Sequence, residues 1–431
     1  MMPTRMRGEA PARRAATQRG VVLLVMLLIL LLGSSYVLVQ RLNHVSEVMT
    51  QDQATAHALA EARAALLGWS VGHPDRPGML PYPDRNGDGN SDCPAGAVNA
   101  NMLLGRLPAS GQTAPCIPPL SGLGVNVTDG SGQGLWYAVS RNLLYQPSGG
   151  GYPAIDPALP EVSTNWLTVR DEFGNVLSDR VAAVILAPGA PLRGQNRAGA
   201  APAAANYLDT ATIGATSYSN ADFDGVFIAA ARGDTFNDQI VYITADELIT
   251  LAERRVARGA QQCLRSYAAA SGGRLSWAAG LDPAAAPDYT GDFGERFGRI
   301  PGAPAVDAAP GSPDASMQTV WPAGCFVAGT YWDRWREFVF YAIAPGYIPG
   351  GAAGCPVCLE INGGGDHHAV VLAAGRALAG QARSSPAQKG TVTNYLEGEN
   401  ATPADNAFER RAGDAAFNDQ ILCIGADAEC Q

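Results

Sequence analysis

The chain carries little charge, and basic residues are its scarcer kind. Only 16% of its 431 residues are charged, and 40 acidic against 30 basic side chains give a net charge of −10 at pH 7. Binding of nucleic acid requires clustered Lys and Arg to neutralise phosphates, so we expect no nucleic-acid partner. The one basic cluster precedes an apolar run near the N-terminus and consists of Arg5, Arg7, Arg13, Arg14 and Arg19.

Patterns of the common catalytic sites are also missing. The chain has five histidines and no Lys-Ser/Thr after its glycine-rich stretches. Nucleophilic catalysis and phosphate binding depend on those groups. Residues 237–238 and 418–419, both Asn-Asp, suggest paired catalytic carboxylates, but each pair precedes an expected strand, which favours a capped turn. We therefore expect a protein that is not an enzyme.

One long apolar run, Val21 to Val39, is present near the N-terminus. It holds 19 residues without a charge, and a helix of that length nearly matches a hydrocarbon core of about 30 Å. The arginines before it predict a cytoplasmic N-terminus and an exported remainder. A cleavable signal peptide fits less well, because the run is long and no small-x-small site precedes Gln40. A buried helix of a soluble protein is the other alternative.

Helix and strand signals continue after this run. Residues 41–70 have no Pro and no Gly before Gly68, so we expect one helix to continue to about residue 70. Its apolar stripe is Ala58, Leu59, Ala62, Ala65 and Leu66, with Glu61 and Arg63 on the other side. Residues 80–128 are typical of a loop. Strands are expected at 134–140, 166–171, 181–187, 226–231 and 239–244, with a turn at 171–179. Asp246 is expected to cap a second helix that runs to residue 270.

The second half of the chain repeats motifs of the first half in the same order. AVILAPGAPLRGQNR (183–197) matches AVVLAAGRALAGQAR (369–383), NYLD (206–209) matches NYLE (394–397), and GDTFNDQIVYI (233–243) matches GDAAFNDQILCI (413–424). WYAVS resembles FYAIA, and the ends of the two helices resemble each other more weakly. Ordered matches of this kind predict a duplicated domain.

The expected fold class is α+β. We expect a long N-terminal membrane-spanning helix packed on an antiparallel sheet, followed by a duplicated α+β domain without a membrane segment. The expected divisions are a basic cytoplasmic leader at 1–20, the transmembrane half of the helix at 21–39, a first α+β domain at 40–245 and a second at 246–431.

All eight cysteines follow the apolar run. An even number in an exported domain favours disulfides, although the sequence does not determine their connectivity and free buried thiols are the alternative. Pairing of neighbours would give Cys93–Cys116, Cys263–Cys325, Cys355–Cys358 and Cys423–Cys430. Cys355 and Cys358, with Asp366, His367 and His368, could instead form a zinc site or a redox pair. The absence of a second Cys-x-x-Cys favours a structural disulfide.

A short acidic segment resembles the first part of a calcium-binding loop. Oxygen-bearing side chains fall at positions 1, 3, 5 and 9, and Gly89 at position 6 permits the tight turn. The candidate ligands are Asp84, Asn86, Asp88, Asn90 (through its carbonyl) and Asp92. Ala95 occupies position 12, where a bidentate Glu is usual. A plain turn rich in Asn, Asp and Gly is the alternative.

The N-terminal arrangement resembles type IV pilins and the pseudopilins of type II secretion. The features are a basic leader ending in Gln18-Arg19-Gly20, the apolar start of a long helix, and then a β-containing domain. The resemblance implies cleavage after Gly20 by a prepilin peptidase, a new N-terminus at Val21, and packing of the helix against other pilin or pseudopilin subunits. It covers residues 18–70 and is only architectural beyond them.

One position departs from that family. Pilins usually carry Glu at the fifth mature position, and this chain has Val25 there; large tip pseudopilins also lack this Glu. The resemblance thus implies a large minor or tip subunit in the bacterial inner membrane, with lipid around its helix and its bulk in the periplasm, or at the cell surface within a pilus. The alternative is a single-pass inner-membrane protein with a periplasmic binding or scaffold domain that is neither cut nor polymerised.

Overall fold

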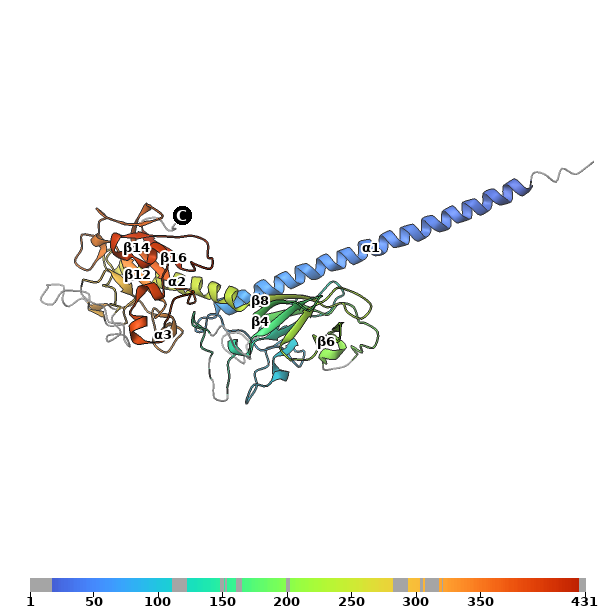
Figure 1. Cartoon of the computed structure of the whole chain (residues 1–431), viewed down its shortest axis with the longest axis horizontal. Helices are drawn as coiled ribbons and strands as arrows, with labels where there is room; N and C mark the ends of the chain where they lie inside the picture. The colour runs from blue at the N-terminus through green and yellow to red at the C-terminus, as the bar shows by residue number, and fades with distance from the viewer. Residues whose placement is uncertain are drawn as a thin grey trace, which may run out of the picture.

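The computed structural model shows one long helix and two sheet-containing domains (Figure 1). It describes residues 18–110, 122–147, 151, 153–159, 165–198, 202–281, 294–302, 305–306, 318–319 and 321–425. The first domain follows the long helix, and the second lies at the other end of the body. This arrangement agrees with the expected α+β class at that level.

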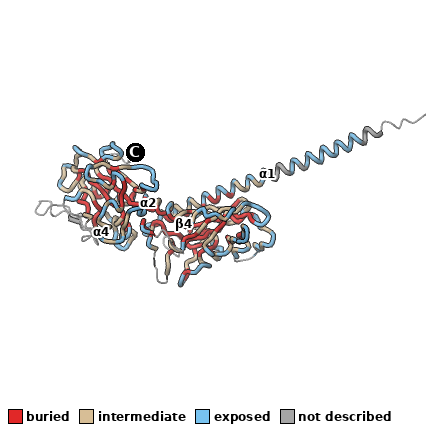
Figure 2. The backbone as a smooth tube through the Cα atoms, in the orientation of Figure 1, coloured by how far each residue is buried: buried red, intermediate tan, exposed pale blue. Residues whose placement is uncertain are grey.

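Helix α1 (Gln18–Gly72) leaves the body over its N-terminal half (Figures 1 and 2). Its window Leu23–Gln40 has a mean hydropathy of 2.4, and 0% of it is buried against the rest of the protein. Within the described residues, α1 is the single helix that is long and apolar enough to cross a membrane. The expected apolar helix is therefore confirmed, and by length and composition it suits either a membrane anchor or a signal sequence.

The C-terminal half of α1 packs on the first sheet. Ala58, Leu59, Ala62 and Leu66 are buried in the core against β2, β4 and β8, so most of the expected apolar stripe is confirmed. Arg63 is not on a purely solvated side, because its guanidinium bonds the carboxylate of Glu247 and the carbonyl of Tyr242. Helical spacing placed Arg63 away from the stripe, but the neighbouring helix approaches on that side.

The first domain is built on a six-stranded sheet. Its strands are β1 (Leu104–Arg106), β2 (Trp136–Val139), β3 (Leu167–Asp171), β4 (Val176–Ala187), β7 (Val226–Ala229) and β8 (Gln239–Thr244). The order is β1-β2-β4-β3-β7, and β8 pairs with β4 beyond the end of β3. A separate hairpin is formed by β5 (Thr210–Ile213) and β6 (Thr216–Ser219).

The second domain contains another six-stranded sheet. Its strands are β9 (Phe297–Arg299), β12 (Val339–Ile343), β13 (Leu359–Ile361), β14 (Gly364–Ala373), β15 (Ala407–Phe408) and β16 (Gln420–Gly425). The order is β15-β13-β14-β12-β9, and β16 pairs with β14. Smaller elements are β10 (Ala305–Val306), β11 (Gln318–Thr319), α3 (Trp332–Trp335) and α4 (Pro386–Lys389). Short 3-10 helices occupy Ala100–Met102, Arg141–Leu143, Ala204–Asn206, Pro345–Tyr347, Val392–Asn394, Gly398–Ala401 and Pro403–Asp405.

Both sheets are mixed, so the expectation of an antiparallel sheet was wrong. β3 runs parallel to β7, and β13 runs parallel to β15, whereas the other pairs are antiparallel. In each domain a long connection follows the central strand and returns the chain to the far edge. A strand that enters after such a crossover can run parallel to its neighbour.

Two local predictions also need correction. The segment 80–128 contains β1, which at three residues is too short for a periodic signal. The expected turn at 171–179 is shorter, because β4 already begins at Val176.

Helix α2 (Ala245–Ala270) is shared by the two domains. Thr244, not Asp246, is its N-cap, since the Thr244 hydroxyl accepts from the N–H of Glu247 (3.2 Å). The first turn, with Leu248, lies in the core of the first domain, and the later turns, with Val256, lie in the core of the second. Figure 2 shows buried backbone in both domains where α2 joins them.

We expect Leu66→Ala to lower the free energy of unfolding by about 2–5 kcal/mol, because Leu66 is fully buried where α1 meets the sheet. Glu61→Ala is the matched control on the exposed side of the helix and should change stability by less than about 0.5 kcal/mol. Thermal unfolding of the full chain in detergent measures both. Equal effects of the two variants would contradict this packing.

Candidate functional site

Three sequence motifs of the first domain meet at the carboxyl end of β4. Gln195 Nε2 donates to Asp209 Oδ1 (2.8 Å), and the N–H of Asn237 donates to Asp209 Oδ2 (2.7 Å). Asp238 Oδ2 accepts from the N–H of Asp209 (2.8 Å) and from Asn220 Nδ2 (3.0 Å). Side chains of the GQNR, NYLD and FNDQ segments thus tie together stretches that are far apart in sequence. We name the set Gln195, Arg197, Asp209, Asn220 and Asp238 the first polar centre.

The second domain contains the same pattern of bonds. Gln381 Nε2 donates to Glu397 Oε1 (2.7 Å), and the N–H of Asn418 donates to Glu397 Oε2 (3.0 Å). Asp419 Oδ2 accepts from the N–H of Glu397 (3.0 Å) and from Asn400 Nδ2 (3.0 Å). A glutamate replaces one aspartate, and the bonds are kept. The second polar centre consists of Gln381, Arg383, Glu397, Asn400 and Asp419.

A tyrosine lies between two arginines beside each centre. In the first domain the guanidinium carbons of Arg197 and Arg106 are 4.8 and 4.4 Å from the ring centre of Tyr207. A positively charged guanidinium over the face of an aromatic ring is stabilised by a cation–π interaction. The matching stack in the second domain comprises Arg383, Tyr395 and Arg299, at 4.5 and 4.9 Å.

The environment of the inner carboxyl group of each centre favours its protonated form. Asp238 and Asp419 are each only 4% exposed. Burial, and then the neighbouring carboxylate of Asp209 or Glu397, raises the pKa of each to about 8. In the described chain, Oδ1 of both aspartates has no other hydrogen-bond partner. A proton on the inner carboxyl group removes the negative charge from this buried position.

These centres hold backbone segments together, and their inner aspartates are almost fully buried. The Asp238 carboxylate bonds a residue 29 positions away, and the Asp419 carboxylate bonds one 22 positions away. The expected turn capping at 237–238 and 418–419 therefore needs correction, since these bonds cross between segments. All three motifs recur in both halves of the sequence. That recurrence could have predicted that their side chains contact one another in the folded domain.

The candidate calcium loop has its carboxylates turned toward its own backbone. Asp84 accepts from the N–H groups of Gly87 (2.7 Å) and Gly89 (2.8 Å), and burial raises the pKa of its carboxyl. Asp92 accepts from the N–H of Arg85 (2.7 Å), and Asp88 from the N–H of Asn90 (2.8 Å). Gly89 has φ +88°, which a glycine adopts freely. In the described chain no group of three or more His, Cys, Asp or Glu side chains is placed to hold a metal ion. Calcium binding therefore stays a prediction.

Two of the expected cysteine pairs lie at disulfide distance. They are Cys263–Cys325, with Cα atoms 5.7 Å apart, and Cys355–Cys358, with Cα atoms 5.2 Å apart. Paired sulfurs are not available to zinc as thiolates. His368 Nε2 lies 2.9 Å from the Tyr347 hydroxyl, so its ring faces another group. Cys93 and Cys423 are disulfide-bonded, while their expected partners Cys116 and Cys430 lie outside the described residues.

The predicted processing site lies in the first turns of α1. Gly20 and Val21 are helical, and the leader up to residue 17 lies outside the described residues. Residues 68–72 read Gly-Trp-Ser-Val-Gly, but they end α1 instead of joining a strand to a helix, and Ser70 is fully buried. This serine therefore does not have the exposed position of a nucleophile elbow.

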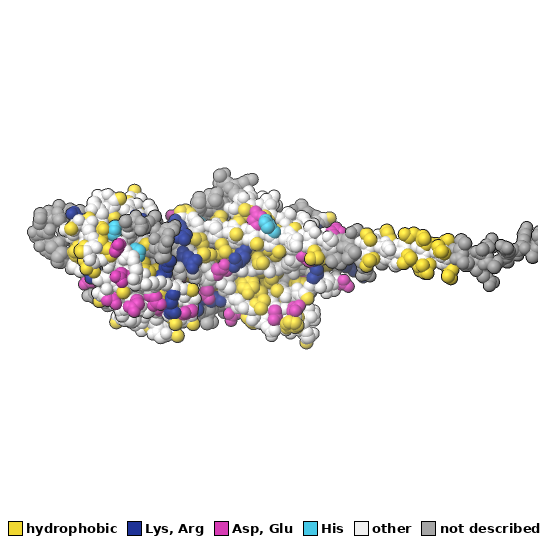
Figure 3. Space-filling model, turned by 90° about the horizontal axis from the view of Figure 1, so that it is seen from above, with side chains coloured by type: hydrophobic (Ala, Val, Ile, Leu, Met, Phe, Trp, Pro, Cys, Tyr) yellow, Lys and Arg dark blue, Asp and Glu magenta, His cyan; other side chains and the backbone are white. Residues whose placement is uncertain are grey.

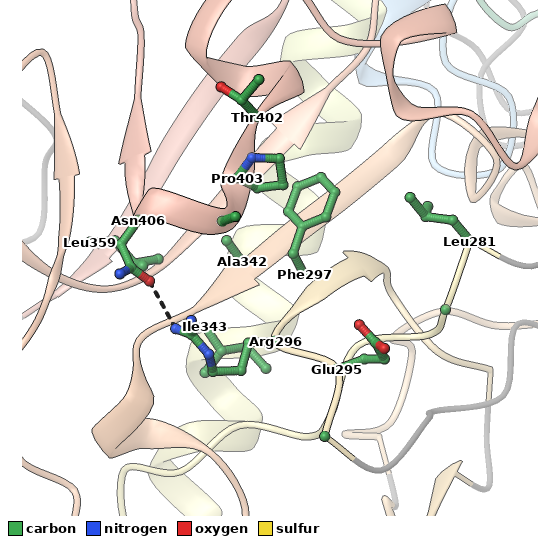
Figure 4. A pocket seen from close by; sticks show the side chains of 13 residues that line it. Leu281, Glu295, Arg296, Phe297, Ala342, Ile343, Leu359, Thr402, Pro403 and Asn406 are labelled. Carbon is green, nitrogen blue, oxygen red and sulfur yellow. Dashed lines mark hydrogen bonds between the residues drawn. The ribbon is translucent and has the colours of Figure 1, made fainter.

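A cavity of about 770 Å³ lies in the second domain where β9, β12 and β13 meet (Figure 4). Apolar Phe297, Ile343 and Leu359 line it together with the charged side chains of Glu295 and Arg296. Arg296 Nη1 donates to Asn406 Oδ1 (2.8 Å) and to the carbonyl of Ile343 (3.2 Å). The cavity has room for an apolar group near one positive and one negative side chain.

No family model matches the chain, and no curated protein or solved structure matches it either.

We expect the stability of the full chain to fall as pH rises from about 5 to about 8. The unfolded chain loses the protons of Asp238 and Asp419 near pH 4, whereas the folded chain keeps them to about pH 8. Each proton therefore contributes at most about −1.4 kcal/mol per pH unit to the free energy of unfolding between those values. Asp238→Asn with Asp419→Asn supplies neutral amides and should flatten this dependence.

Thermal unfolding across this pH range measures the effect. Asp234→Asn, at an exposed position just before the FNDQ segment, is the control and should leave the dependence unchanged. A pH dependence in the double variant equal to that of the wild type would show that the two aspartates are not protonated.

We expect a calcium chelator to lower the melting temperature, because an ion bound only by the folded chain stabilises it. The Asp84→Ala/Asp88→Ala variant should show no chelator shift. If the wild type shows no shift, or if the variant shifts equally, the Asp84–Asp92 loop is not a calcium site.

Proposed function

We propose that this chain is a membrane-anchored, non-enzymatic pilin-like or pseudopilin-like subunit of a type IV pilus or type II secretion apparatus. The observation that carries the proposal is the division of α1. Its window Leu23–Gln40 is apolar, uncharged and exposed beyond the body, and its C-terminal half packs against a sheet. A helix of this kind suits insertion in lipid next to other such helices, with the body held outside the membrane.

The body of this subunit is proposed to be a duplicated domain. The two sheets share strand order and strand directions, including one parallel edge pair in each. The two polar centres share their bonds as well. Two unrelated domains would have no physical reason to repeat an arrangement of this detail. In this proposal the first copy carries the membrane segment and the second copy extends the exported surface.

The subunit would be a large minor or tip type. Val25 is 50% exposed on the free part of the helix and offers no carboxylate to a neighbour's terminal amine. The proposed partners are membrane lipid, a prepilin peptidase that cuts after Gly20, and other pilin or pseudopilin subunits. The proposed location is the bacterial inner membrane with the body in the periplasm, or the cell surface within a pilus.

A second candidate is an uncut, single-pass scaffold or binding protein with a periplasmic body. The cavity beside Phe297 and Arg296 favours it, because a binding domain needs such a space. Full retention in the inner membrane, with absence from sheared pili, would support this candidate.

We expect the mature chain to begin at Val21 in a strain with prepilin peptidase and at the leader in a strain without it. Mass spectrometry of the N-terminal peptide measures this. Gly20→Glu should block cutting, because a charged side chain replaces the residue before the cut. Gly33→Ala, in the same apolar helix where a Cβ meets nothing within 4 Å, is the control. An intact leader in both strains would overturn the processing claim.

A further inference from the structure

An exposed apolar tip protrudes from the first domain. Outside α1, the described chain has five large hydrophobic residues that are strongly exposed, and three of them lie on the β3–β4 hairpin. They are Phe173 (72%), Leu177 (51%) and Val176 (48%). Gly174, at the turn, lies beside the β5–β6 hairpin. Apolar side chains gathered at one protruding point favour a contact with another surface.

The hairpin tip also carries negative charge. Asp171 and Glu172 precede Phe173, and Asp179 follows Leu177. The nearby arginines point to other groups: Arg170 donates to the carbonyl of Gly174, and Arg180 bonds Asp246 of α2. A partner surface for this tip must therefore offer an apolar floor and positive charges around it.

The second domain has a groove with those properties. It has a volume of about 410 Å³ and lies between α2 and the segment that precedes β16. Ile421 and Leu422 form its apolar floor. Its arginines come from two elements: Arg254 and Arg258 are four residues apart on one face of α2, and the others precede β16. We name this set, Arg254, Arg258, Arg410 and Arg411, the arginine groove.

The arginines of the groove differ in their partners. Arg411 lies 3.1 Å from both Glu409 and Asp414, while Arg254, on the exposed face of α2, bonds the neutral amide of Gln420 (3.0 Å). Asp419 lines the groove, but its Oδ2 accepts from the N–H of Glu397 and from Asn400 Nδ2, and burial raises the pKa of its carboxyl. The matching edge of the first domain differs, because there Gln239 and Arg232 bond the acidic Asp52 of α1. Figure 3 shows Lys and Arg side chains in a band across the middle of the body.

The charge of the whole chain makes a second copy the fitting occupant. Without the five arginines and one glutamate of residues 1–20, the net charge is −14. Identical bodies so acidic repel one another unless a negative part of one meets a positive part of the next. The tip belongs to the first domain and the arginine groove lies along α2 in the second domain, so joining them in two copies links different domains.

We propose that the β3–β4 hairpin tip of one copy docks in the arginine groove of a second copy. The contact joins two different surfaces and is therefore head to tail, the type that can continue into an open chain of subunits. A single hairpin tip buries less than the roughly 1,200–2,000 Å² of a stable interface, so the contact depends on both copies being held in one membrane. It deepens the proposed function, and it favours a minor subunit present in several copies over a single tip subunit.

The test uses two full-length copies with different tags, expressed together in membranes. One copy carries Val176→Cys in the tip and the other carries Ala412→Cys in the arginine groove, and a short thiol cross-linker joins them. We expect a product that contains both tags. Ala379→Cys is the control, since this residue is also exposed but lies in the second domain, away from the tip and from every cysteine in sequence, and it should give no product.

A charge exchange tests the specificity of the contact. Glu172→Arg in the tip copy should lower the yield at least about tenfold, and adding Arg258→Glu in the groove copy should restore it. Equal yields from Val176→Cys and Ala379→Cys, or a product of Val176→Cys with a different protein only, would overturn the proposal. Because both copies stay in the membrane whether or not the leader is cut, failure of processing and failure of this contact are observed separately.

Discussion

Each domain depends on a buried pair of carboxyl groups. Asp209 with Asp238, and Glu397 with Asp419, are largely removed from water, where a carboxylate is stable only with hydrogen-bond donors or a proton. The donors are backbone N–H groups and side-chain amides from separate segments of the chain. The long connections after β4 and β14 must therefore return to the residues that precede β8 and β16. Those strands then pair with the centre of each sheet and complete it.

Helix α2 connects the two domains and contributes side chains to the core of each. Its first turn is buried in the first core and its later turns in the second, so the two cores share one rigid rod. The ion pair between Arg334 and Asp156 (3.9 Å) also joins the domains, but an ion pair of this kind adds little. The exposed face of α2 is left free for Arg254 and Arg258. The same helix thus sets the position of the second domain and forms one wall of the arginine groove.

Local pattern predicted much of the secondary structure. Helical spacing indicated both long helices, and alternating or β-branched segments indicated β2, β3, β7 and β8. β1 was not predicted because three residues are too few to show an alternating hydrophobic pattern. The parallel edge strands were not predicted because the direction of a strand depends on how the preceding connection crosses the sheet. Asn237-Asp238 and Asn418-Asp419 stood out as repeated residues, yet their partners, at Asp209 and Glu397, are remote in sequence. A local explanation by turn capping was therefore the wrong one.

The sequence by itself determined the apolar helix, the order of the elements and the repeated motifs, because each depends on composition or on spacing along the chain. Only the tertiary structure decided the mixed sheets, the burial of each polar centre and the union of four arginines in one groove. Those features need residues from distant segments to come within a few ångströms of one another. Burial, which no local motif indicates, raises the pKa of Asp238 and Asp419 to about 8, because the charged carboxylate loses its hydration.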